Sequence, residues 1–133
     1  MKRTFIITLA MVIALTLVGC TAEPADLVGE WTQKDPASDD SYMIATITES
    51  TIEVYWFTTE GSTKALYWSG TYIAPTEAGD HSWDSVNNTE KTSAALLASG
   101  DATKAFTYSS ESGEISFDMS MLGVTTTITL IAK

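Results

Sequence analysis

Apolar and polar residues alternate most regularly near the end of the chain. Between Glu114 and Met121 every second residue is apolar, and across residues 124–131 Val124, Ile128 and Leu130 fall on one face. A period of two residues is typical of a strand that has one face in a core. With Leu122-Gly123 between them, the two segments predict a closing β-hairpin.

Similar strand-like segments fill most of the preceding chain. They cover residues 27–34, 42–48, 51–58, 64–74, 81–87 and 103–109. Turn-forming clusters that contain Pro36, Gly61, Pro75 or Gly113 separate several of them. Between the fifth and sixth segments, Asn88 or Thr89 is a candidate cap for a short helix. That helix would run through the alanines and leucines of residues 93–98 to Gly100.

This order of elements predicts an all-β fold. Eight antiparallel strands are a natural number for a small barrel, because closing the sheet removes both exposed edges. We therefore expect an eight-stranded up-and-down barrel with one short helix. A two-sheet β-sandwich would produce almost the same pattern and stays open as the alternative.

The central strands carry large side chains on both faces, which simple alternation does not explain. Aromatic residues occur in succession there, and they are candidates for lining a cavity or forming an exposed recognition patch. The alternative is a core on one face and an ordinary barrel exterior on the other. The candidate contact residues for a ligand or partner are Trp31, Tyr55, Trp56, Tyr67, Trp68 and Tyr72.

Gly29-Glu30-Trp31, in the first predicted strand, resembles the Gly-x-Trp motif of lipocalins and their calycin relatives. The resemblance implies a barrel in which Trp31 closes one end and packs near a basic residue from a late strand. Lys133 is the only basic residue that the last strand offers for this role. The chain departs from the family because it is shorter and its helix lies between the fifth and sixth strands instead of after the eighth.

The N-terminal residues have the composition of an export signal. Lys2 and Arg3 precede an apolar run at residues 5–18, of about fourteen residues, too short to span a bilayer. The run ends in Leu17-Val18-Gly19-Cys20, which resembles the bacterial lipobox. The resemblance implies a signal peptide at 1–19, an acylated Cys20 with a short tether at 20–26, and one domain at 27–133. A plain signal anchor with a chance cysteine is the alternative.

The net charge limits the classes of partner that are expected for the mature chain. Removing Lys2 and Arg3 from the 7 basic residues leaves 5 basic against 17 acidic residues, a formal net charge of −12. Nucleic acid and anionic lipid both require basic patches, so neither is an expected partner. The expected membrane contact is the lipid on Cys20, at the cell membrane or outer membrane and outside the cytoplasm.

Residues that carry chemistry are sparse. His81 is the only histidine and Cys20 the only cysteine, and no Gly-x-Ser-x-Gly elbow occurs, so we assign no catalytic residue and expect no cofactor. The loop with Asp35, Asp39 and Asp40 is a weak calcium candidate, since calcium prefers six to eight oxygens. These residues also form turns through their own side chains.

Three hypotheses for function follow. The first is a non-enzymatic binding module, lipid-anchored in the cell envelope, for a small apolar ligand or an envelope partner. The second is a membrane-surface interaction protein with no small-molecule ligand, such as a prophage-type or envelope-machine accessory. The third, a hydrolase using acidic residues, has only the abundance of acids in its favour.

Overall fold

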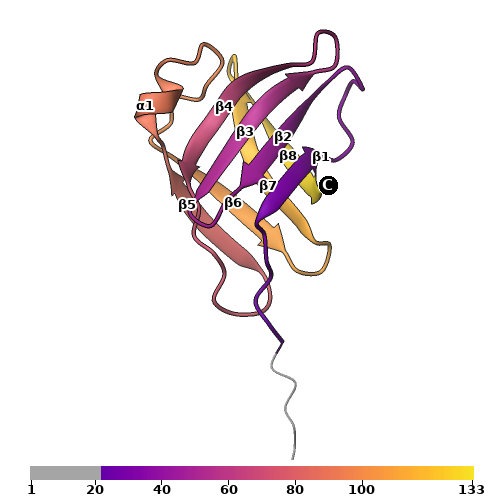
Figure 1. The fold of residues 1–133 in the computed structure, drawn as a ribbon, viewed down its shortest axis with the longest axis vertical. Coiled ribbons are helices and arrows are strands. Elements are labelled where there is room, and N and C mark those ends of the chain that lie inside the picture. The colour runs from indigo at the N-terminus through magenta and orange to yellow at the C-terminus, as the bar shows by residue number, and fades with distance from the viewer. Residues whose placement is uncertain (1–21) are drawn as a thin grey trace, which may run out of the picture.

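The structure, a computed structural model, describes residues 22–133 and contains eight strands and one short helix (Figure 1). The predicted signal segment and Cys20 lie outside these residues. The elements are β1 (Gly29–Gln33), β2 (Ser41–Ile47), β3 (Thr51–Thr58), β4 (Thr63–Thr71), β5 (His81–Val86), α1 (Thr89–Thr92), β6 (Thr103–Ser109), β7 (Glu114–Met121) and β8 (Val124–Ala132).

All eight strands belong to one antiparallel sheet in the order β4-β3-β2-β1-β8-β7-β6-β5. Strands that follow one another in the chain are therefore neighbours, and β1 also pairs with β8. The only consecutive pair without a ladder is β4 and β5, whose edges meet at a single bridge between Gly70 and Asn87. The result is the expected up-and-down barrel, nearly closed, in place of a two-sheet sandwich.

Close backbone approach holds the β4–β5 seam together. The Trp68 indole N–H donates to Ser85 Oγ at 2.9 Å, and the Asn88 N–H donates to the Ser69 carbonyl at 2.8 Å. A Cβ atom on Gly70 would lie 2.3 Å from Ser85 Oγ and 2.6 Å from the carbonyl oxygen of Val86. The seam therefore requires glycine at this position.

The inward faces of the strands meet in one apolar core. Aromatic rings form a continuous stack across it, with ring centroids 5.2 Å apart between Trp83 and Phe106 and between Phe106 and Phe117. Aliphatic side chains from β2, β3, β7 and β8 fill the remaining space. The buried aliphatic residues of these strands are Met43, Ala45, Ile47, Ile52, Val54, Ile115, Ile128 and Leu130.

Because successive strands are antiparallel neighbours, the connections between them alternate between the two ends of the barrel. The β1–β2, β3–β4, β5–β6 and β7–β8 connections share one end, which we call the far end. The described chain begins at the opposite, near end, where it enters β1 (Figure 1). Any attachment through the N-terminal segment thus holds the near end.

The helix is shorter than the sequence predicted. It ends at Thr92, and residues 93–98 form turns closed by Ala95 N–H to the Thr92 carbonyl and Ala98 N–H to the Ala95 carbonyl. Leu96 is 98% exposed, so a longer helix would have no apolar face to bury. The Ser99 N–H instead donates to the Tyr67 carbonyl on β4, which directs the segment across the barrel.

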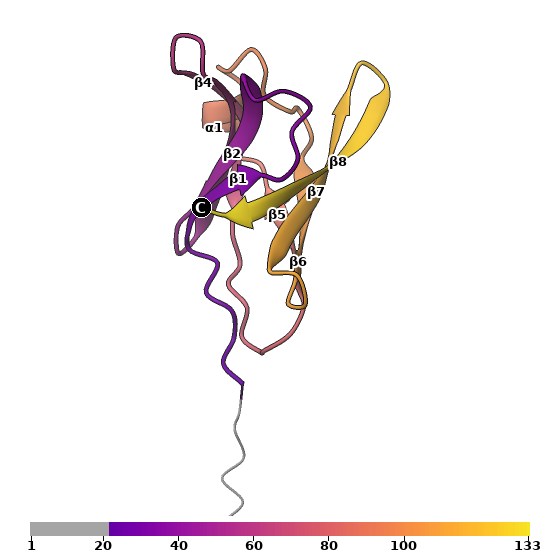
Figure 2. The ribbon, with the colours of Figure 1, turned by 90° about the vertical axis from the view of Figure 1, so that its right-hand side faces the viewer.

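The hairpin of β7 and β8 extends beyond the barrel at the far end (Figure 2). β7 pairs with β6 only at residues 114–116, and β8 pairs with β1 only at residues 130–132. β7 and β8 nevertheless remain paired up to Met121 and Val124. We call residues 118–127 the arm, because these residues form a two-stranded ribbon whose outer edges pair with no neighbouring strand.

Candidate functional site

Five of the six candidate aromatic residues lie inside the barrel. Trp31, Tyr67, Trp68 and Tyr72 are each at most 5% exposed, and Trp56 packs against the same core. Their rings fill the interior together with the aliphatic core. The sixth candidate, Tyr55, lies on the outer face of β3.

Trp31, for which the Gly-x-Trp resemblance implied a role in closing one end of the barrel, is buried on β1. Its indole N–H donates to the Leu27 carbonyl at 2.9 Å, and this bond fixes the segment that enters β1, in which Leu27 itself is buried. Lys133 forms an exposed ion pair with Glu30, at 3.8 Å, on the outer surface. The lysine that packs against interior aromatic rings is instead Lys104.

A β-bulge explains why both Tyr67 and Trp68 point inward. Val54 pairs with Trp68 but the next residue, Tyr55, pairs with Leu66, so Tyr67 is the extra residue on β4. A bulge places one additional residue in one strand and redirects its side chain. The Tyr67 ring thereby reaches Phe117 on the far wall, with centroids 6.1 Å apart.

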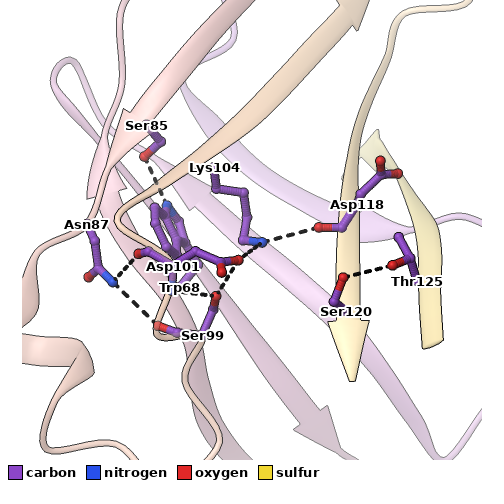
Figure 3. Close-up of polar contacts among 9 residues, drawn as sticks. All are labelled: Trp68, Ser85, Asn87, Ser99, Asp101, Lys104, Asp118, Ser120 and Thr125. Carbon is purple, nitrogen blue, oxygen red and sulfur yellow. Dashed lines mark hydrogen bonds and ion pairs between the residues drawn. The ribbon is translucent and has the colours of Figure 1, made fainter. Parts of the chain in front are cut away.

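Lys104 is the feature of the interior that the sequence reading missed. Its side chain on β6 is only 5% exposed, and its ammonium lies 5.3 Å from the ring of Tyr67 and 5.5 Å from that of Trp68. The ammonium donates to the Asp118 carbonyl at 3.2 Å and pairs with Asp101 at 3.4 Å (Figure 3). Lys104 alternates with Phe106, which predicts that its side chain points inward. A lysine at such a position is, however, normally interpreted as part of an exposed strand edge.

These contacts satisfy a buried charge. An ammonium has three donors, and here a carboxylate, a carbonyl and two aromatic faces surround it. Lys104 also lies where the β6–β7 ladder has ended, so its bond to the Asp118 carbonyl joins β6 to the base of the arm. Its role in the described structure is to hold β4, β6 and β7 together.

Large side chains also gather outside the barrel, on β2, β3 and β4. Tyr42 pairs with Phe57, with ring centroids 5.3 Å apart, and Ile44 pairs with Tyr55. The ammonium of Lys64 lies 5.6 Å from the ring of Tyr55. We call these five residues the outer aromatic face. A surface groove of about 130 Å³ runs along Tyr42, Ile44, Phe57 and Lys64.

Glu53 sits beside this face in a network of hydrogen bonds. It accepts from Lys91 at 2.6 Å, from the Tyr55 hydroxyl at 2.5 Å and from Ser69 at 3.3 Å. The bond from Lys91, followed by that from Tyr55, lowers the pKa of Glu53. Partial burial, followed by the bond to Glu53, raises the pKa of Tyr55 to about 12. The network is an ion pair with fixed donors, and it holds the Tyr55 ring in place.

His81 and its neighbour Asp80 have structural partners. The Nε2 atom of His81 donates to the Ile73 carbonyl at 2.6 Å, and its ring stacks on Trp83. Asp80 accepts from the backbone and side chain of Ser110, which lowers its pKa. Asp80 therefore serves the β6–β7 turn and does not orient His81.

The acidic loop between β1 and β2 behaves as a set of turn residues. Asp35, Asp39 and Asp40 are exposed, and the Asp40 N–H donates to Ser38 Oγ at 3.1 Å within the turn. Asp40 also accepts from the Thr59 hydroxyl, which joins this loop to the β3–β4 turn. Within residues 22–133, no three histidine, cysteine or acidic side chains gather in a group suited to a metal ion.

Comparison of this chain with known proteins does not assign a function, so the proposed function is argued from the geometry. The chain matches no protein-family model, and no similar curated protein or solved structure was found. In the part of the chain that the structure describes, no helix combines the length and hydropathy needed to cross a membrane.

Proposed function

We propose that this chain is a lipid-anchored, non-enzymatic binding module of the bacterial cell envelope that recognises a partner protein through its outer aromatic face. The observation that carries the proposal is the division of aromatic residues between the two sides of the sheet. Inside, they are packed against one another. Outside, Tyr42, Tyr55 and Phe57 remain partly exposed, and Tyr42 and Phe57 line a groove.

The composition of this face supports a protein partner. Tyrosine and other aromatic residues are enriched where proteins bind one another, because they bury much area at little cost in conformational entropy. The Glu53 network and the cross-strand pair of Tyr42 and Phe57 restrain these side chains before binding. Restraint in the free state lowers the entropy lost on association.

The proposed anchor agrees with the direction in which the chain enters the barrel. The six residues of the tether from Thr21 to Asp26 reach about 20 Å when extended. Leu27, the next residue, is buried at the near end and fixes the tether there. An acylated Cys20 would therefore hold the near end close to the membrane and leave the outer aromatic face on the side of the barrel.

A small apolar ligand is the second candidate, and one observation favours it. The indole N–H groups of Trp56 and Trp83 are buried without a hydrogen-bond acceptor among the described residues. A buried donor without a partner carries a desolvation cost of about 1–3 kcal/mol. A ligand with one acceptor group would relieve that cost, provided that the side chains around it moved apart.

Capture of envelope proteins on the full-length lipidated chain tests the main proposal. The chain would be purified from detergent-solubilised envelopes, and the double variant Tyr42→Ser/Phe57→Ser compared with wild type. We expect the captured partner to fall about tenfold or more, as for the loss of a binding hot spot. Ile131→Ser, an apolar-to-polar change at a position on β8 that is 37% exposed, is the matched control and should retain the partner. Equal capture by the double variant and wild type would contradict the proposal.

A further inference from the structure

A second apolar surface lies at the far end of the barrel. Leu96, from the segment after α1, is 98% exposed, and Leu122, at the tip of the arm, is 97% exposed. Leu97 and Met121 are exposed beside them, at 49% and 41%. Scattered apolar residues are normal on a surface, but several that converge on one place mark an interaction site.

These four residues form the walls of one cleft. The cleft has a volume of about 350 Å³, and the buried ring of Tyr67 forms part of its floor. The Lys104 ammonium lies 5.3 Å from the centre of that ring and also holds the base of the arm through the Asp118 carbonyl. Tyr67 and Lys104 therefore fix the positions of both walls. We call this cleft the far-end cleft.

The near end and the far end are separated by the height of the barrel. A nine-residue strand such as β4 spans roughly 30 Å. The described chain enters at the near end, and the arm extends beyond the barrel in the opposite direction (Figures 1 and 2). The proposed anchor at Cys20, on which this placement rests, holds the near end toward the membrane, and Leu96 and Leu122 lie at the opposite end of the barrel.

Charge at the far end indicates the chemistry of the occupant. Its connections carry exposed carboxylates, namely Asp35, Asp39, Asp40, Glu60 and Asp101. Four described lysines lie nearby: Lys34 pairs with Glu114, Lys91 pairs with Glu53, Lys104 is buried, and exposed Lys64 lies against the Tyr55 ring on the outer aromatic face. An apolar cleft with an acidic surround favours a partner that has basic residues beside an apolar one. A second copy of the same acidic chain would be repelled.

We propose that the far-end cleft binds a protein partner that inserts an apolar side chain flanked by lysine or arginine, on the side away from the anchoring membrane. This site is separate from the outer aromatic face. The two surfaces together would let the anchored chain contact two proteins at once.

Site-specific photocrosslinking in the producing cell tests this site on the full, lipidated chain. A photoreactive phenylalanine analogue would replace Leu122 or Leu96, with Glu111 in the β6–β7 turn at the near end as the control position. We expect both far-end positions to give a discrete adduct with one and the same partner protein, which is not a second copy of this chain. Glu111 should give no adduct. Leu96→Ser should lower the adduct from position 122 about tenfold, while thermal melting stays unchanged.

Other outcomes would overturn the proposal. An adduct of twice the chain's mass would identify a second copy as the occupant, and an adduct with lipid would identify a membrane. Absence of any adduct from both far-end positions would remove the site. Adduct yield that does not fall in about 1 M salt, where the screening length is roughly 3 Å, would contradict a basic partner. Loss of the outer-face partner in Tyr42→Ser/Phe57→Ser should leave the far-end adduct in place, so each proposal can fail alone.

Discussion

Two residues that look ordinary in the sequence determine how the barrel closes. Gly70 allows β4 to approach β5 at the one place where no ladder joins them. Lys104 joins β4, β6 and β7 where the β6–β7 ladder stops. Neither role follows from local pattern, because each depends on what another strand places opposite the residue.

Gly70→Ala tests the seam. A methyl group at this position would overlap Ser85 Oγ and the Val86 carbonyl, so we expect a loss of about 1–3 kcal/mol in the free energy of unfolding. Urea unfolding of residues 22–133 measures it. Gly100→Ala is the matched control, because nothing lies within 4 Å of its added methyl. Equal stability of the two variants would contradict the packing described at the seam.

The lowered pKa of Glu53 predicts that the stability of the fold depends on pH in the acid range. Its pKa is lowered in the folded chain, so its contribution is present above the ordinary value of 4.5 and is lost as the pH falls through the folded value. Glu53→Gln should lower the free energy of unfolding by about 1–2 kcal/mol at neutral pH, with a smaller difference in acid. Denaturant unfolding between neutral pH and pH 3 measures both effects.

Glu77→Gln provides the comparison for that series. Glu77 is exposed in the β4–β5 loop, so its replacement should leave the acid dependence of wild type in place. If Glu53→Gln retained the full difference from wild type at every pH, the ion pair with Lys91 would not be the source of the effect.

At the scale of elements, alternation predicted strand positions well and their ends less well. The residues from Glu114 to Met121 form β7 as expected, and Asp118 lies on the solvent face. The apolar face continues through Met119, which still packs against the core, to Met121, which is 41% exposed. Alternation reports which face of a strand is apolar, but it cannot tell whether another strand covers that face.

The bulge and the helix show the same limit. A run such as Leu66-Tyr67-Trp68 does not reveal that one residue is skipped in pairing, so Tyr67 could not be assigned to the interior from the sequence. Helix propensity in residues 93–98 was overridden because the segment has no surface on which to bury a helical face. Five of the six candidate aromatic residues belong to the core. Their burial could not be predicted from the sequence for a related reason, because their neighbours across the barrel come from distant strands.

The arm should exchange its amide hydrogens faster than the barrel. Its two strands pair only with each other, and a hairpin without further neighbours is marginally stable. We expect amides at residues 119–126 to exchange roughly 100-fold faster than those in the centre of β2 and β3. Hydrogen exchange followed by NMR measures this difference. Uniform protection along β7 would mean that the arm is packed against the barrel.

The whole molecule is an acidic barrel whose two candidate surfaces lie on its outside. Eight strands and their order were accessible from the sequence, because strand count and turn spacing limit the choice of architecture. The near-closed seam was not, since it arises from one glycine and the segment after β5. Lipidation remains a prediction from Leu17-Val18-Gly19-Cys20.

Cys20→Ser tests the anchor. Wild type should incorporate labelled palmitate and stay with the membrane fraction, because two or more acyl chains hold a protein stably. The variant should lose the label. Thr21→Ser, next to the modified residue, is the control and should behave as wild type. Labelling that persists in Cys20→Ser would show that another residue carries the lipid.

The central claim is that recognition takes place on the outside of a barrel whose interior is already filled. Titration of residues 22–133 with a fluorescent fatty-acid probe tests it most directly, with Tyr42→Ser/Phe57→Ser measured in parallel. The account predicts no saturable one-to-one binding below about 10 μM, since filling the core leaves no space for an acyl chain. Saturable one-to-one binding that neither the outer-face variant nor Leu96→Ser in the far-end cleft changes would contradict it and identify the interior as the binding site.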